Sequence, residues 1–152
     1  MPTGAFVAVA EQPWLDFRVG KPVGRDIEQG TVAAGGGYDN AFVFSGWTEG
    51  GGVVSQAVVS SPLTGISMEL VTDQPSVQFY SGNNLDCSIH VKADQASPLN
   101  PAACYPHWGA VVLEAQRFPD SVHHFGDPSW PSVALEPGQV YSQRTGYRFT
   151  LP

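Results

Sequence analysis

Charged side chains are scarce in this sequence, and basic ones are the scarcest of all. Only 14% of its 152 residues are charged, with 7 Lys and Arg against 14 Asp and Glu, and the formal net charge is −7. An acidic surface repels the phosphates of nucleic acids and of anionic membranes. The composition therefore disfavours both as partners, and it favours a neutral ligand over a phosphorylated one.

Cysteines and long apolar runs are also lacking. Cys87 and Cys104 are the only cysteines and have no Cys-x-x-Cys spacing, so we expect neither a disulfide scaffold nor a zinc site. Buried free thiols in a reducing compartment are the expectation instead. No apolar stretch approaches the ~20 residues that span a bilayer, and residues 1–6 lack the basic and apolar regions of a signal peptide. These features predict no membrane association and a cytoplasmic location.

Glycine, proline and alternating apolar residues, by contrast, are abundant. The 17 Gly and 13 Pro predict many turns, and a hydrophobic fraction of 42% is enough for a core. Alternation with a period of two predicts strands, whereas no convincing amphipathic helix appears. The candidate strands are Ala5–Val9, Ala41–Phe44, Val53–Ser60, Ile66–Leu70, Ser76–Tyr80, Gly109–Gln116 and Tyr141–Leu151. We therefore expect one all-β domain over residues 1–152, an antiparallel β-sandwich.

Glu114 is the most informative charged residue, because it interrupts an apolar run. On a strand, Val111, Leu113 and Ala115 would face one way and Glu114 the other, beside Val112 and Gln116. The first set suits a core, and the second, which mixes apolar and polar groups, suits the lining of a cleft. The alternative is an ordinary glutamate on the solvent side of a strand.

Two further polar residues are candidate ligands for a small molecule. Asp39 lies in Gly-Tyr-Asp-Asn, which is also good turn chemistry, and Gln78 lies within the candidate strand Ser76–Tyr80. A carboxamide both donates and accepts hydrogen bonds, which matches neighbouring sugar hydroxyls, although a polar residue on the wet face of a strand would look the same. The aromatic residues Phe79, Tyr80, Trp108 and Trp130 can stack on a sugar ring or fill a core.

The four histidines do not form a recognisable metal-binding motif. His90 and His107 are isolated, and His123 and His124 are adjacent, with Asp127 close behind. Neighbouring residues on a strand point in opposite directions, so this pair would not bind one metal ion from a strand. We expect no metal site.

Several segments, taken in order, resemble the C-terminal half of the aldose 1-epimerase (galactose mutarotase) family. Gly37–Phe42 resembles its Gly-aromatic-Asp-His/Asn-x-aromatic segment, and Gln74–Asn83 resembles its Gln-Pro-Gly-Val-Gln-Phe-Tyr-Thr-Gly-Asn segment. Leu113–Ser121 resembles its Leu-Glu-Thr-Gln-x-x-Pro-Asp-Ser segment. The other family-like segments are Pro2–Gly4, Pro13–Arg18, Trp130–Ser132, Leu135–Tyr141 and Thr145–Phe149. The ordered set covers nearly the whole chain and is highly specific.

The resemblance implies a fold, a reaction and the roles of three residues. The fold would be the C-terminal half of the galactose mutarotase-like supersandwich. The reaction would interconvert the α and β anomers of a hexose, such as galactose or glucose, by acid/base ring opening. Glu114 stands where the family has its general base, and Asp39 and Gln78 stand where it has sugar-hydroxyl ligands. The family needs neither a metal nor an organic cofactor, so we expect none.

The resemblance also predicts what this chain lacks. The family's acid histidine, its second histidine and a sugar-binding arginine come from segments before the Pro-Thr-Gly stretch, which here begins at Met1. We therefore expect a truncated homologue that is weak or inactive alone, with exposed strand edges that favour self-association. One alternative is a non-catalytic carbohydrate-binding or structural remnant of the fold. Another is a hexose-6-phosphate 1-epimerase, with Arg117, Arg144 and Arg148 as the cationic residues for the phosphate.

Overall fold

The computed structural model describes residues 3–30 and 35–152. Pro2, which begins the Pro-Thr-Gly segment, lies outside the described residues. The strands are β1 (Asp39–Val43), β2 (Val54–Ser60), β3 (Ser67–Thr72), β4 (Ser76–Tyr80), β5 (Val112–Gln116) and β6 (Thr145–Thr150). Single 3-10 turns occur at η1 (Val9–Glu11), η2 (Pro13–Leu15), η3 (Val23–Arg25), η4 (Ile27–Gln29), η5 (Ala93–Gln95) and η6 (Ser121–His124).

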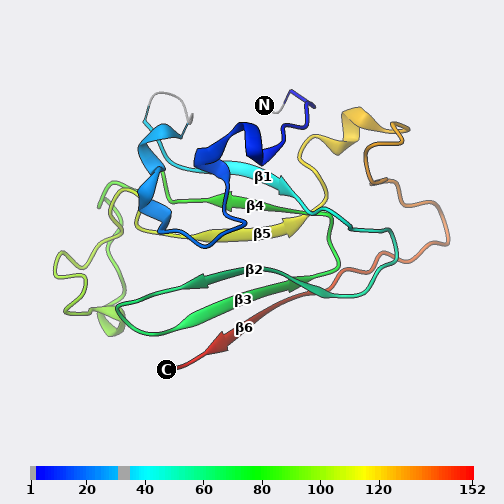
Figure 1. Cartoon of the computed structure of the whole chain (residues 1–152). Helices are drawn as coiled ribbons and strands as arrows, with labels where there is room; N and C mark the ends of the chain where they lie inside the picture. Colours follow the sequence, from blue (N-terminus) through cyan, green and yellow to red (C-terminus); the bar gives the residue numbers. More distant parts are fainter. Residues whose placement is uncertain (1–2, 31–34) are drawn as a thin grey trace. The chain divides into compact units, whose positions relative to one another are not determined.

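The strands form two sheets, with the orders β1-β4-β5 and β2-β3-β6. β3 pairs antiparallel with both β2 and β6, and β4 points against β1 and β5 (Figure 1). The described residues contain no α-helix, which agrees with the abundance of turn residues and the period of two. The predicted all-β, antiparallel fold class is confirmed.

The chain divides into two compact units. The first contains Ala41–Gln78, Leu113–Pro152 and the N-terminal residues up to Gly4, and the second contains Ala5–Asn40 and Phe79–Val112. Each unit is built from segments that are far apart in the sequence. The prediction of one domain over residues 1–152 stays a prediction.

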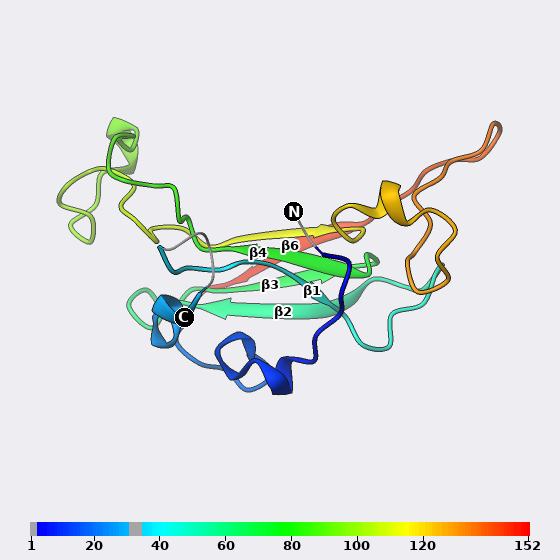
Figure 2. The ribbon, with the colours of Figure 1, turned by 90° about the horizontal axis from the view of Figure 1, so that it is seen from above.

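Strand pairing and a small buried core hold the first unit together. Leu70 of β3 is opposite Ala57 of β2 and Tyr147 of β6, and it is fully buried. The Tyr147 hydroxyl donates a hydrogen bond of 2.7 Å to the Leu113 carbonyl of β5, so the two sheets are linked within this unit. The connection from β5 to β6 is a long loop that leaves the strands and returns to them (Figure 2).

Aromatic packing and one buried ion pair characterise the second unit. Tyr38 is fully buried and stacks on Trp14 and Phe79, and the ring of Phe17 meets Tyr38 and Phe79 edge-on. The ammonium group of Lys21 lies 2.7 Å from the Asp26 carboxylate, and only 7% of the Lys21 side chain is exposed. A charge can be buried at this depth because the carboxylate and two backbone carbonyls surround it.

The prediction of free thiols is wrong, because Cys87 and Cys104 form a disulfide. Their Cα atoms lie 4.9 Å apart, within the usual range for a disulfide. Backbone pairing brings them together: the amide of Cys87 donates to the Tyr105 carbonyl, and the amide of Tyr105 donates to the Ile89 carbonyl. The argument for a reducing compartment therefore loses its basis, and a cytoplasmic location stays a prediction.

The predicted strand Ala5–Val9 is also wrong. Residues 5–8 lie outside the strands, and Val9 begins the turn η1. Phe6 and Val7 are both about half exposed, at 52% and 56%, so apolar side chains on both faces of this segment meet solvent. A strand needs a paired neighbour and one drier face, and alternation alone supplies neither.

No helix in the described part of the chain is long and apolar enough to cross a bilayer.

Candidate functional site

Glu114 lies at the centre of β5 with its backbone held on both sides. Leu113 is buried and Glu114 is exposed, as the alternation of the sequence predicts. The carbonyl of Leu113 accepts a hydrogen bond from the Tyr147 hydroxyl at 2.7 Å, and that of Ala115 accepts one from the Gln143 side chain at 3.1 Å. These contacts fix the strand before and after Glu114 and leave its carboxylate facing solvent.

Gln78 lies on β4, the neighbour of β5 in the sheet. The Ser76 hydroxyl donates a hydrogen bond of 2.8 Å to the Gln116 carbonyl, so these two residues mark where the antiparallel strands meet. Gln78 lies two residues beyond Ser76 on β4, and Glu114 lies two residues before Gln116 on β5. The two residues therefore lie on neighbouring strands of one sheet, each close along its strand to this contact.

Asp39 is the first residue of β1 and belongs to the second unit. It is exposed, whereas its neighbour Tyr38 is buried and firmly held. The Tyr38 amide donates to the Ser81 hydroxyl at 2.8 Å, and the Tyr38 carbonyl accepts from the Asn83 amide group at 2.9 Å. Burial raises the pKa of the Tyr38 phenol, so this anchor remains neutral at physiological pH. Asp39 therefore projects from a rigid support.

The histidines do not gather at one place in the described structure. His123 pairs with Asp120, while the ring of His124 stacks on Trp130 with a centroid separation of 3.8 Å. His107 packs against Trp108. Among residues 3–30 and 35–152, no group of three or more His, Cys, Asp or Glu side chains is arranged to hold a metal ion.

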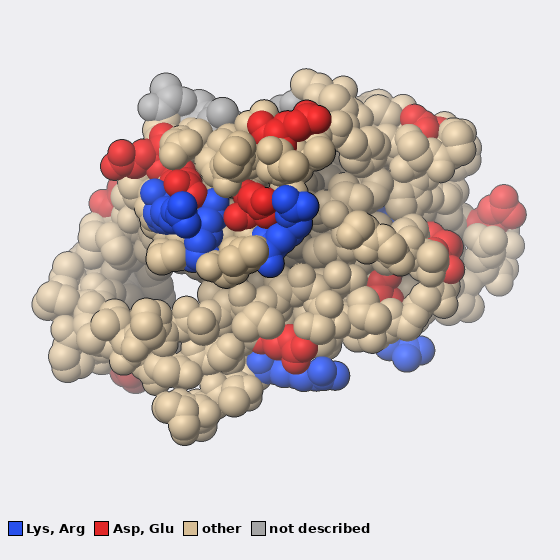
Figure 3. All heavy atoms as spheres, in the orientation of Figure 1, with Lys and Arg blue, Asp and Glu red and all other residues tan. Residues whose placement is uncertain are grey.

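Two of the three arginines considered for a phosphate are paired with carboxylates. Arg117 contacts Glu49 at 2.7 Å, and Arg148 contacts Glu69 at 3.4 Å. On the face drawn in Figure 3, most basic side chains lie beside acidic ones, and no broad basic surface appears. Cations that are already paired attract a phosphate less strongly.

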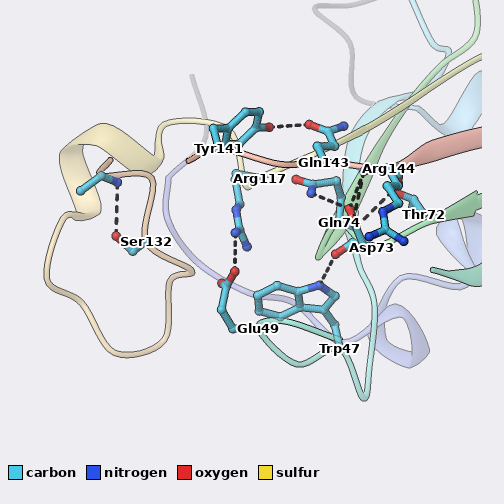
Figure 4. A network of polar contacts seen from close by, with 11 residues as sticks. Trp47, Glu49, Thr72, Asp73, Gln74, Arg117, Ser132, Tyr141, Gln143 and Arg144 are labelled. Atoms are coloured by element: carbon cyan, nitrogen blue, oxygen red, sulfur yellow. Dashed lines mark hydrogen bonds and ion pairs between the residues drawn. The ribbon is translucent and has the colours of Figure 1, made fainter. Parts of the chain in front are cut away.

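Sequence reasoning missed the two residues that support Glu114. Gln143 and Tyr147 lie 28 and 34 positions from the carbonyls they bind, and no short-range pattern reveals such a contact. Gln143 in turn accepts a hydrogen bond of 2.6 Å from the Tyr141 hydroxyl (Figure 4). The candidate strand Tyr141–Leu151 and the family-like segment Thr145–Phe149 were the available signals, and neither indicated that these side chains support β5.

Comparisons with known proteins place this geometry in context. A family model described as aldose 1-epimerase matches residues 1–148. Galactose mutarotase of Bos taurus is 31% identical over 151 residues, which are 99% of this chain and 39% of that protein. Galactose mutarotase of Homo sapiens is also 31% identical over 151 residues, which are 99% of this chain and 39% of that protein. Aldose 1-epimerase of Escherichia coli (strain K12) is 34% identical over 141 residues, 89% of this chain and 36% of that protein. The chain thus spans well under half the length of these relatives.

Proposed function

The chain belongs to the aldose 1-epimerase family. We propose that it carries the part of a hexose 1-epimerase site that contains the general base. Glu114 is the general base, and Gln78 and Asp39 bind hydroxyl groups of the sugar. The observation that supports the proposal is that the exposed side chain of Glu114 and the carboxamide of Gln78 come from neighbouring strands, with the β5 backbone held by Tyr147 and Gln143. A carboxylate next to a donor and acceptor group suits a sugar with neighbouring hydroxyls.

The proposed reaction opens and recloses the pyranose ring. Glu114 takes the proton of the C1 hydroxyl while an acid protonates the ring oxygen, and the bond between C1 and that oxygen breaks to give the open-chain aldehyde. Rotation about C1–C2 presents the other face of the carbonyl, and the reverse proton transfers reclose the ring as the other anomer. Each positioned proton-transfer group typically contributes ~10²–10⁴-fold in rate.

The acid comes, in this proposal, from the part of the family that the chain does not match. The relatives extend far beyond the 36–39% that this sequence spans. Within the first unit, His123 and His124 are engaged by Asp120 and Trp130 respectively, which makes neither a good candidate for the acid. We therefore expect the chain by itself to bind a hexose weakly and to accelerate mutarotation little.

A chimera tests this proposal. The chain would replace the matching part of the Escherichia coli aldose 1-epimerase, which is 36% of that protein, and polarimetry would follow freshly dissolved α-galactose as it approaches equilibrium. We expect the chimera to exceed the spontaneous rate clearly and the chain alone to remain near it. A chimera that folds, as judged by circular dichroism, yet does not accelerate the reaction would support a non-catalytic remnant instead.

Exposed apolar residues on the β2-β3-β6 sheet support self-association as a further part of the proposal. Phe149 is 64% exposed and Val58 is 65% exposed, and β2 and β6 are the outer strands of their sheet. Outer strands with apolar side chains readily pair with another β segment. Light scattering should detect dimers or larger species of the isolated chain at micromolar concentrations, and a strictly monomeric chain would contradict this.

A further inference from the structure

A second candidate site lies in the first unit, and its lining includes neither Glu114 nor Gln78. It is a cleft of about 460 Å³ whose apolar lining includes four aromatic side chains: Phe44 and Trp47, which follow β1, and Phe118 and Trp130, which follow β5. Glu49, Ser129 and Ser132 add polar groups to the lining. The volume lies within the ~300–1,000 Å³ typical of small-molecule sites. An aromatic lining with few polar groups is also typical of such sites.

The ring of Trp47 is fixed before any ligand arrives. Its indole N–H donates a hydrogen bond of 2.7 Å to the Asp73 carbonyl. The carboxylate of Asp73 is itself held by the backbone amide of Arg144 and by the Gln74 side chain. Figure 4 shows this chain of contacts from Trp47 through Asp73 to Arg144. An aromatic ring held in one orientation loses little conformational entropy when a ligand stacks on it.

Hydrogen-bond donors and a hydrogen-bond acceptor lie near the ring of Trp47. The guanidinium of Arg117 lies 5.2 Å from the ring centroid of Trp47 and donates to Glu49 Oε1 at 2.7 Å (Figure 4). Arg117 Nη1 is buried and has no hydrogen-bond acceptor among the described residues. Ser132 Oγ accepts from the Ala134 amide at 3.2 Å, so its hydroxyl hydrogen remains available to donate. Glu49 and Ser132 line the cleft, whereas Arg117 does not and only holds Glu49 from behind the lining. A carboxylate and a hydroxyl together can bind adjacent hydroxyl groups.

The charges of the cleft select against an ion. Glu49 and Arg117 neutralise each other, and the chain as a whole carries a net charge of −7, so an anion gains nothing from the surrounding field. The aromatic lining favours a ligand with a flat, weakly polar face, and the ion pair favours one with hydroxyl groups at its edge. A neutral pyranose has both features.

We propose that this cleft is a second carbohydrate site, which binds the pyranose ring of a neutral sugar or glycan without transforming it. The apolar face of the sugar stacks in the aromatic lining beside Trp47, and its hydroxyls bind Glu49 and Ser132. The site is independent of the proposed catalytic function, because neither Glu114 nor Gln78 lines the cleft.

Methyl β-galactoside is the probe, because its anomeric oxygen is methylated and it cannot mutarotate. Titration of the full chain, labelled with nitrogen-15, would follow the indole signals of its four tryptophans. We expect saturable shifts of Trp47 and Trp130 with a dissociation constant on the order of 1–20 mM. No saturable shift of either signal up to about 100 mM would overturn the proposal.

Three variants locate the binding. Glu49→Gln keeps the shape of an exposed side chain and should weaken binding roughly tenfold or more, because a hydrogen bond to a charged group is lost. Glu136→Gln removes an exposed carboxylate elsewhere in the same unit and should change nothing. Glu114→Gln should also leave the Trp47 shift intact. Equal binding by Glu49→Gln and the wild type, or loss of the shift in Glu114→Gln, would show that the sugar binds elsewhere.

Discussion

The two compact units of this chain are stabilised in different ways. In the first, β3 pairs with β2 and β6 over its whole length, and its side chains Leu70 and Thr72 are fully buried. The second unit relies on a cluster of aromatic rings around Tyr38, the buried Lys21–Asp26 pair and the Cys87–Cys104 disulfide. The paired strands of the first unit distribute their stabilising energy over many weak hydrogen bonds, whereas the disulfide of the second unit concentrates it in one covalent bond.

The difference explains why the proposed base lies on a strand of the first unit. Glu114 needs a backbone that does not move when a proton is transferred, since small errors in alignment reduce the rate strongly. β5 supplies this through pairing with β4 and through the contacts from Tyr147 and Gln143. The predictions below test whether the two units do differ in this way.

The largest change in stability is expected from the core of the first unit. Leu70→Ala should lower the free energy of unfolding by about 2–5 kcal/mol, because it empties a fully buried site in the central strand. Val58→Ala on β2 is the control, since Val58 is 65% exposed, and it should cost about 0.5 kcal/mol or less. Urea unfolding of both variants measures the difference. Similar costs for the two would mean that β3 is not the centre of this core.

The disulfide is expected to dominate the second unit. It joins cysteines that are 17 residues apart, and closing a loop of this size is worth about 3 kcal/mol. The double variant Cys87→Ser, Cys104→Ser should therefore increase hydrogen exchange at two amides inside or beside this loop. They are the amide of Val91, which donates to the Ala103 carbonyl, and the amide of Tyr105, which donates to the Ile89 carbonyl. Amides of β3 should keep their protection from exchange. A uniform loss of protection in both units would show that the disulfide does not stabilise the second unit selectively.

A smaller effect is expected from the link between the two sheets of the first unit. Tyr147→Phe removes only the hydroxyl that binds the Leu113 carbonyl, at a cost of about 0.5–1.5 kcal/mol. Tyr141→Phe is the matched control, because its hydroxyl binds the exposed side chain of Gln143. Chemical denaturation should show the larger loss for Tyr147→Phe, and the reverse order would remove this residue as a support of β5.

The smallest effect concerns a partly buried carboxylate in the second unit, that of Asp16. Hydrogen bonds from the Arg18 side chain and backbone lower the pKa of Asp16 from 3.8 to about 2. A lowered folded-state pKa stabilises the fold above the unfolded value, and this contribution is lost as the pH falls from about 4 towards 2. NMR titration should find the low pKa in the wild type and a value closer to 3.8 in Arg18→Gln. An unchanged pKa in the variant would contradict this cause.

The strands could be predicted where apolar and polar residues alternate in the sequence. The candidate Ser76–Tyr80 is β4 without correction, and Val53–Ser60 differs from β2 by one residue. Ala5–Val9 failed because its apolar residues have no drier face, and the candidate Tyr141–Leu151 is a strand only over Thr145–Thr150. Alternation locates a strand but does not show its partners: β4 pairs with β1 and β5, which lie far from it in the sequence.

The roles of Glu114, Gln78 and Asp39 stay predictions, which rest on the recognisable segments that contain these residues. The alternation around Glu114 correctly set Leu113 inside and Glu114 outside. The contacts of Tyr147, Gln143 and Ser76 depend on how distant strands meet. The disulfide was missed for the same reason, since backbone pairing of residues 87–91 with 103–105 brings the two cysteines together.

The role of Glu114 is tested most directly by the rate of galactose mutarotation in the chimera with the Escherichia coli relative. Glu114→Gln keeps the size and hydrogen bonding of the side chain but cannot accept a proton at neutral pH, so the enzyme-dependent rate should fall about 10²–10⁴-fold. Glu136→Gln, a change at another exposed glutamate, should leave the rate unchanged. If Glu114→Gln proceeds at the rate of the unmodified chimera, Glu114 is not the base and the proposed site is wrong at its central residue.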